Sequence, residues 1–178
     1  MSLMKNARPR PDEYDKAFER YVSRVPETDI LAALEAQPAE IAAALASVPP
    51  AREEYRYAPG KWTVRGVLGH ILDAERVFGY RALCISRGEK ASLPAFEEDD
   101  YAARAGHDRR PVASLLEEFA TLRKSHVLML RHVDDEAWTR FGTANALPVT
   151  PRAIAYILVG HVRHHVAVLK DKYGVGAM

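Results

Sequence analysis

Apolar residues recur at intervals of three and four along most of this chain, which is the spacing of one face of an α-helix. Runs in which β-branched and polar residues alternate, as they would in strands, do not stand out. We therefore expect an all-α fold. Four segments are long enough to be the main helices of a bundle: residues 29–47, 63–87, 111–133 and 150–173.

Residues that favour helix ends border these segments. Thr63 and Thr150 stand where an N-cap residue is expected, and Pro151 takes the first helical position, which tolerates proline best. Gly88 is well placed to end the second segment. Pro38 lies inside the first segment, where we expect it to interrupt or kink the helix. The second and fourth segments thus have end signals of their own.

A shorter apolar segment precedes the four long ones. Aromatic and aliphatic residues at helical spacing lie between Tyr14 and Val25, and Pro26 follows them. We expect an extra short N-terminal helix that docks on a four-helix bundle.

Two long connections, 88–110 and 134–149, are expected to contain no strands. The first carries four consecutive acidic residues at 97–100. These residues either cover the end of the bundle or are simply solvated, and the sequence leaves both readings open.

Length and composition favour one globular domain, 1–178. The chain has 178 residues, of which 48% are hydrophobic and 28% charged, so its composition suggests neither disorder nor a fibrous protein. Its 25 Lys and Arg offset 24 Asp and Glu without a long basic run, which argues against nucleic-acid binding. No apolar stretch approaches the roughly 20 residues of a membrane span, so we expect no membrane association.

Cysteine usage favours a reducing compartment. Cys84 is the only cysteine, which excludes an intramolecular disulfide and a CxxC metal or redox motif. No basic and then apolar leader precedes the domain. We expect a cytoplasmic protein in which Cys84 is a small buried apolar residue rather than a nucleophile.

The chemistry that the sequence offers is concentrated in histidines of the last helix. His161 and His165 are four residues apart and fall on the apolar arc with Ile154 and Leu158, so both imidazoles face inward. A buried imidazole needs a partner at each ring nitrogen. Either each histidine binds a separate backbone group, or one shared metal ion satisfies both. His164 lies at the edge of the arc.

A metal site needs at least one more ligand, and His70 at the shoulder of the second helix's apolar arc is the best candidate. Asp73 and Glu75, close behind it, are candidates for a general base or for orienting an imidazole. The structural alternative, in which they are salt-bridge partners of the nearby Arg76 and Arg81, explains each of them better.

The remaining histidines and the tryptophans are expected to have structural or surface roles. We expect His107, His126 and His132 at the surface, and Trp62 and Trp138 as core or hinge anchors, with lining of the site as the alternative for the tryptophans.

Four motifs in order along the chain resemble the DinB/YfiT-like superfamily: Tyr57-Ala58-Pro59-Gly60-Lys61-Trp62, Gly69-His70-Ile71-Leu72-Asp73-Ala74-Glu75-Arg76, Leu93-Pro94-Ala95-Phe96-Glu97-Glu98-Asp99, and the His161 to His165 motif. The resemblance implies a four-helix bundle of up-down-down-up type, often a homodimer. It also implies a divalent metal ion held by one histidine of the second helix and two of the fourth, here His70, His161 and His165.

Three neutral imidazoles leave room for water on the ion, which is the pattern of a catalytic site. Zinc and nickel both suit imidazole ligands. The expected function is hydrolysis of a small molecule by metal-activated water. Two alternatives stay open: an S-transferase or isomerase that uses a low-molecular-weight thiol, and a non-catalytic binding or stress-response protein that the metal stabilises.

Overall fold

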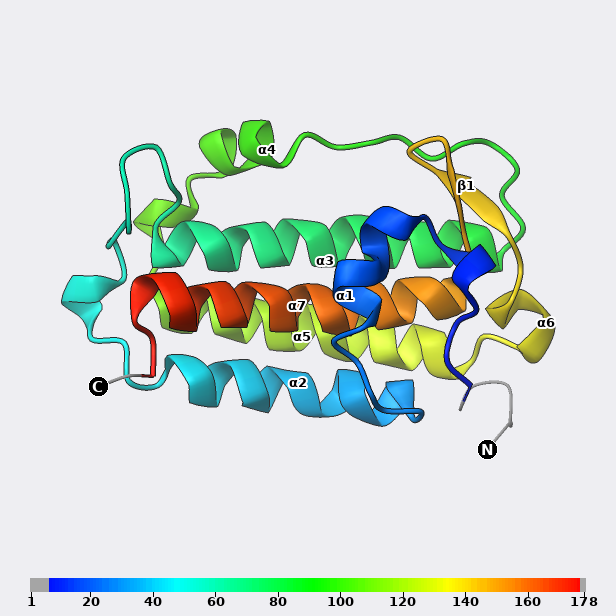
Figure 1. Cartoon of the computed structure of the whole chain (residues 1–178), viewed down its shortest axis with the longest axis horizontal. Coiled ribbons are helices and arrows are strands. Elements are labelled where there is room, and N and C mark those ends of the chain that lie inside the picture. The colour runs from blue at the N-terminus through cyan, green and yellow to red at the C-terminus, as the bar shows by residue number, and fades with distance from the viewer. Residues whose placement is uncertain (1–6, 177–178) are drawn as a thin grey trace.

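Four long helices form the body of the protein in the computed structural model, which describes residues 7–176 (Figure 1). They are α2 (Ile30–Leu45), α3 (Val64–Ser86), α5 (Val112–Arg131) and α7 (Pro151–Tyr173). Helices α2 and α3 each pack against both α5 and α7, so α2 and α3 occupy diagonal corners of the bundle. The predicted all-α four-helix bundle is confirmed, and each helix end lies within two residues of its predicted position.

The four helices follow an up-down-down-up order. Helices α2 and α7 run in one direction and α3 and α5 in the other (Figure 1). Because α3 and α5 are parallel, the chain between them must return along the whole length of the bundle. This return segment carries the short helix α4 (Glu98–Ala105) and the 3-10 turn η4 (His107–Arg109), both packed against α3.

Side-chain caps and glycines fix the ends of the helices as the sequence predicts. The Thr63 hydroxyl accepts a hydrogen bond from the Gly66 amide at the start of α3, and Thr150 accepts one from Ala153 at the start of α7. Gly174 ends α7 with a φ of 69°. Helix α2 continues through Pro38, so the prediction of an interruption there is wrong.

The expectation of a chain without strands is wrong at one place. Strands β1 (Gly142–Ala144) and β2 (Leu147–Val149) form an antiparallel hairpin in the connection before α7. Its turn residues Asn145 and Ala146 have φ values of 53° and 58°. Three-residue strands are too short to show an alternating pattern, and the turn lacks the glycine that usually marks a tight hairpin.

The N-terminal segment packs along the bundle, as the sequence predicts. It consists of the 3-10 turns η1 (Pro11–Glu13) and η2 (Lys16–Phe18) followed by helix α1 (Glu19–Val22), which packs against α7. The approach to α7 is close, because a Cβ atom on Gly160 would lie 2.0 Å from the Tyr21 carbonyl oxygen. The remaining short elements are η3 (Pro50–Arg52) and α6 (Asp135–Trp138).

The apolar core is divided into two clusters along the bundle. One includes Ile30 and Leu34 of α2 together with Trp138, and the other includes Ile41 and Leu45. No helix within residues 7–176 is both long enough and apolar enough to cross a membrane.

Candidate metal centre

Three histidines converge between α3 and α7. His70 comes from α3, and His161 and His165 come from successive turns of α7. The Nε2 atom of His161 lies 3.0 Å from Nε2 of His70 and 3.1 Å from Nε2 of His165. Within residues 7–176, these three side chains form a group whose potential ligand atoms all lie within 4.8 Å of one another. The structure thus brings together the three residues proposed as metal ligands.

The donor set fits a metal ion better than it fits hydrogen bonds among the rings. A neutral imidazole has one N–H and one lone pair, so the central Nε2 of His161 has only one in-plane site with which to meet two neighbours. Nitrogen ligands of one tetrahedral zinc ion, each about 2.0–2.1 Å from it, stand about 3.3 Å apart. The observed spacings of 3.0 and 3.1 Å are close to that value.

Electrostatics keep these imidazoles neutral. Burial lowers the pKa of His70 to about 4, against the opposing charges of Asp73 and Asp99. Burial, together with the unfavourable interaction of a second protonated imidazole with His70 and His164, lowers the pKa of His165 to about 2. Burial also lowers the pKa of His161 well below its ordinary value. Neutral imidazoles keep the lone pairs that a metal ion needs.

Aromatic rings enclose the cluster. The Trp62 indole lies against His70 with ring centroids 4.7 Å apart, and the Tyr21 ring meets His161 edge-on at 5.2 Å. Phe78 lies 6.2 Å from His161. These rings desolvate the imidazoles and restrict their orientation, so Trp62 takes the role of a site-lining residue.

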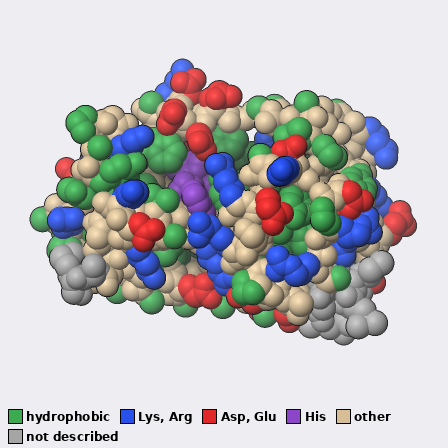
Figure 2. Space-filling view, viewed as in Figure 1, with side chains coloured by type: hydrophobic (Ala, Val, Ile, Leu, Met, Phe, Trp, Pro, Cys, Tyr) green, Lys and Arg blue, Asp and Glu red, His purple; other side chains and the backbone are tan. Residues whose placement is uncertain are grey.

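One side of the cluster opens to the surface. A pocket of about 440 Å³ is lined by His165 together with Tyr57, Gly60, Lys61, Trp62, Val67, Glu98, Asp99, His164, Val168 and Tyr173. Figure 2 shows histidine side chains in a hollow of this face, with acidic side chains on one side and basic side chains on the other. Of the three candidate ligands, His165 lines this pocket, so a small molecule can approach the cluster from the side of His165.

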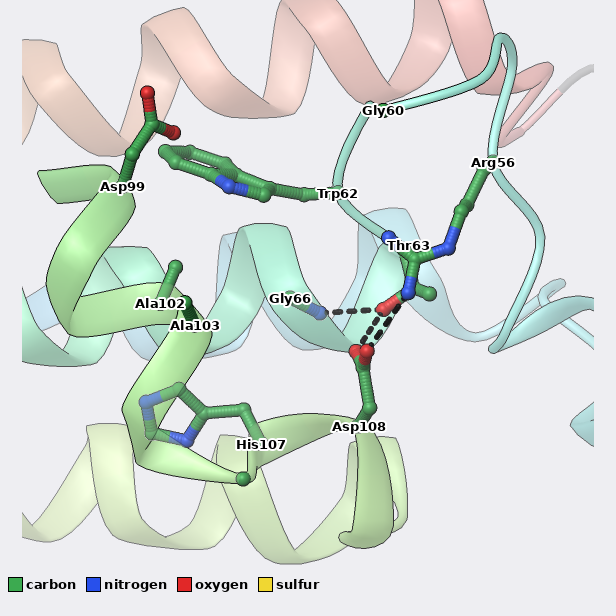
Figure 3. A pocket seen from close by; sticks show the side chains of 11 residues that line it. Arg56, Gly60, Trp62, Thr63, Gly66, Asp99, Ala102, Ala103, His107 and Asp108 are labelled. Atoms are coloured by element: carbon green, nitrogen blue, oxygen red, sulfur yellow. Dashed lines mark hydrogen bonds and ion pairs between the residues drawn. The ribbon is translucent and has the colours of Figure 1, made fainter.

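A second pocket of about 440 Å³ lies behind Trp62 (Figure 3). Gly60, Trp62 and Asp99 line both pockets, so the Trp62 side chain forms part of the wall of each. In the second pocket Asp108 accepts hydrogen bonds from Arg56 and from the Thr63 hydroxyl. This pocket contains none of the three clustered histidines.

One acidic residue at the cluster, Glu98, was not predicted from the sequence. The Glu98 Oε2 atom lies 3.7 Å from Nε2 of His70. The acidic stretch 97–100 was expected either to cover the bundle end or to be solvated. All four residues are exposed, and the last three form the first turn of α4. Nothing in the local sequence separates Glu98 from its acidic neighbours, because only the packing of α4 on α3 selects it.

Asp73 is paired with a histidine. Its Oδ2 atom lies 3.1 Å from Nε2 of His107, which is 8% exposed. The prediction that His107 lies at the surface is therefore wrong. Gly69 explains the burial, because a Cβ there would lie 2.1 Å from the His107 ring.

Glu75 is buried in a different network. Its carboxylate accepts two hydrogen bonds from Arg123, at 2.8 and 2.7 Å, and its Oε1 lies 2.8 Å from Nδ1 of His126. Burial opposes the charge of Glu75, but Arg123 and His126 outweigh it and lower the pKa of the carboxyl.

The predicted partners of Asp73 and Glu75 are wrong. Arg76 pairs with Glu118, and Arg81 donates to the Pro94 carbonyl. Of the other histidines predicted at the surface, His132 is exposed, and His126 is half-buried against Glu75.

His164 packs beside the cluster, whereas Cys84 packs against the apolar core. The His164 ring packs against His165 and Tyr21, with centroids 5.0 and 5.4 Å apart. Burial, with the charges of Arg24 and Arg20, lowers the pKa of His164. Cys84 of α3 is partly buried and packs against the apolar core.

Comparison with known proteins gives two findings. The family model of the DinB superfamily matches residues 33–169. Among solved structures, the chain is similar to YfiT from Bacillus subtilis, described as a probable metal-dependent hydrolase with an unusual four-helix bundle topology. The match has a TM-score of 0.74 at 19% identity and covers 96% of this chain and 95% of YfiT. No curated protein sequence gives a significant match.

Proposed function

Because this chain belongs to the DinB superfamily, we propose that its histidine cluster holds a divalent metal ion and that the protein hydrolyses a small molecule there. The observation that carries the proposal is the convergence of three Nε2 atoms, from His70, His161 and His165, beside a pocket of about 440 Å³. Pockets of roughly 300–1,000 Å³ are typical of small-molecule sites. The relative YfiT is described as a probable metal-dependent hydrolase, which supports the same class.

When bound, the ion would lower the pKa of a water molecule and polarise the substrate. The protein's own part is to supply three neutral imidazoles, to shield them with Trp62 and Tyr21, and to leave one side open to the pocket. Zinc and nickel are the proposed ions, because both suit imidazole nitrogen.

Asp73 is a better candidate than Glu75 for a role at the metal site. The charge of Asp73 acts on His70, whose pKa it raises against the effect of burial, so Asp73 is proposed to support the ligand or accept a proton. Both oxygens of Glu75 accept hydrogen bonds from Arg123, so a role for Glu75 as a base would require that pair to open. A homodimer and a cytoplasmic location stay predictions.

Metal analysis of one variant pair tests the site. We expect the purified protein to bind about one zinc or nickel ion per chain, and His161→Ala to lose most of it in elemental analysis. The control is His132→Ala, which removes an exposed histidine at the end of α5. If His161→Ala and the control retain equal metal, the proposed site is wrong.

Activity assays then test the reaction. The metal-loaded protein is assayed with panels of esters, amides and activated electrophiles, with and without added low-molecular-weight thiols. We expect hydrolysis that is independent of thiol and absent from His161→Ala. A rate that appears only with thiol would replace the hydrolase by the thiol-dependent transferase. Loss of folding on chelation with no turnover of any substrate would favour a metal-stabilised binding protein.

A further inference from the structure

The candidate ligands of the metal centre carry no negative charge. Three neutral imidazoles would leave a dication at its full charge in a site whose histidines His70 and His161 are 2% and 5% exposed. Charges held away from water are costly unless an opposite charge stands near them. Groups that contact metal ligands or bound water typically change metal affinity by about 10–100-fold. An acidic side chain next to the cluster would therefore matter to metal binding.

Glu98 is the acidic side chain that geometry places there. Its Oε2 atom is 3.7 Å from Nε2 of His70, and it lines the same pocket as His165. The carboxylates that follow His70 on α3 are held elsewhere, Asp73 by His107 and Glu75 by Arg123. Glu98 therefore approaches the cluster from α4, on the side that opens to solvent.

Glu98 is close to the cluster without belonging to its ligand set. The group of atoms within 4.8 Å of one another contains the three histidines and, in the part of the chain that the structure describes, does not extend to Glu98. Its side chain is 60% exposed, so it can adjust to whatever occupies the open side. This position suits a group that pairs with a water molecule on the open side, more than it suits a fourth fixed ligand.

We propose that Glu98 is the anionic group of this centre, and that its carboxylate accepts a hydrogen bond from water held at the open side of the ion. This proposal rests on the metal site of the proposed function. The contact lowers the net charge of the site and strengthens metal binding. Helix α4 thereby contributes directly to a centre whose ligands lie on α3 and α7.

The test is metal affinity measured by competition with a chromophoric chelator, with zinc and with nickel as the probes. Glu98→Gln keeps the shape of the side chain and removes its charge, and we expect its dissociation constant to rise about 10–100-fold. Glu98→Asp keeps the charge and should retain more of the affinity. The matched control is Glu97→Gln, which removes an equal charge from an exposed neighbour at the N-cap of α4.

Asp99 is the alternative candidate for the anionic group, because it lines both pockets and its charge raises the pKa of His70. We expect Asp99→Asn to weaken binding less than Glu98→Gln does. Equal losses in the Glu97, Glu98 and Asp99 variants would mean a general field effect and would overturn the assignment. So would unchanged affinity in Glu98→Gln.

Metal binding by the wild-type and His161→Ala proteins distinguishes a failure of the role of Glu98 from a failure of the metal site itself. If wild type binds metal through His161 and Glu98→Gln binds it equally well, only the role of Glu98 fails. If wild type binds no metal, or His161→Ala binds it normally, the metal site of the proposed function fails as well.

Discussion

At the scale of single residues, two glycines of α3 decide where imidazoles from outside the helix can lie. A Cβ at Gly69 would lie 2.1 Å from the nearest atom of the His107 ring, and one at Gly79 would lie 2.1 Å from Nε2 of His126. Each glycine thus gives a histidine room to reach a carboxylate of α3. Both histidines were predicted at the surface, because the sequence does not show that a glycine-bearing face of α3 packs against them.

Alanine at Gly79 should therefore have opposite effects in two backgrounds. In wild type, Gly79→Ala displaces the His126 ring and strains its hydrogen bond to Glu75, and we expect a loss of about 1–3 kcal/mol in the free energy of unfolding. In a His126→Ala background the obstacle is gone, and the better helix propensity of alanine should stabilise the protein by up to about 1 kcal/mol. Urea denaturation of the four proteins measures the cycle, and the same sign in both backgrounds would refute the packing argument.

The histidine pair of α7 could be predicted from the sequence. His161 and His165 are one turn apart on one helix, so helical periodicity alone places them together. His70 was the best candidate for a third ligand although periodicity put it at the shoulder of its helix, and the family resemblance strengthened that assignment. Glu98 could not be found, since its place depends on how a short helix in a long connection packs against α3.

At the scale of elements, a buried polar layer joins all four main helices. Arg123 of α5 donates to Glu75 of α3 and, at 2.6 Å, to the side-chain oxygen of Gln37 of α2. Gln37 in turn donates to the Val159 carbonyl of α7 at 2.8 Å. A polar layer of this kind favours one alignment of the helices over alternatives shifted along their axes, because a shift would leave buried charges unpaired.

Removing one partner of this layer should be far more damaging than removing an exposed ion pair. Arg123→Met leaves the buried charge of Glu75 without its cation, and we expect a loss of about 3–5 kcal/mol in the free energy of unfolding. Arg76→Met, which breaks the more exposed pair with Glu118, should cost less than about 1 kcal/mol. Chemical denaturation compares the two, and equal losses would mean that the buried pair has no special role.

Element boundaries followed from local signals, but contacts between elements did not. Thr63, Thr150 and Gly174 mark helix ends by caps that act within a few residues. The hairpin before α7 could not be predicted from local signals alone, because a distant residue also pairs with it. The Leu93 amide donates to the Thr143 carbonyl, and the Asn145 amide donates to the Leu93 carbonyl. Such contacts depend on the whole return segment between α3 and α5.

At the scale of the whole molecule, the N-terminal segment is tied to the start of α7. The buried Glu13 carboxylate accepts hydrogen bonds from Arg152, from the Thr150 hydroxyl at 2.9 Å and from the Arg10 amide at 3.2 Å. Farther along, Tyr21 of α1 packs on His161. The ion pair at Glu13 therefore helps to hold the segment that covers one side of the metal centre.

This tie should make stability depend on pH. Burial alone would raise the pKa of Glu13, but the hydrogen bonds from Arg152, Arg10 and Thr150 outweigh it and lower the pKa below the ordinary value. The unfolded chain therefore binds the proton more readily, so this stabilisation is present at neutral pH and is lost as the pH falls below the ordinary pKa of a glutamate and through the lowered pKa of Glu13.

Glu13→Gln removes the titrating group and leaves the buried Arg152 without its counter-charge. We expect the variant to be about 3 kcal/mol less stable than wild type at pH 7, with the difference shrinking as the wild-type carboxyl takes up its proton. Asp12→Asn is the control, because Asp12 is an exposed neighbour that pairs with Arg10 at the surface. Denaturation curves at a series of pH values measure this difference. A gap between Glu13→Gln and wild type that stays constant with pH would contradict a contribution from the titration of Glu13, and no gap at any pH would show that Glu13 acts through its shape and not through its charge.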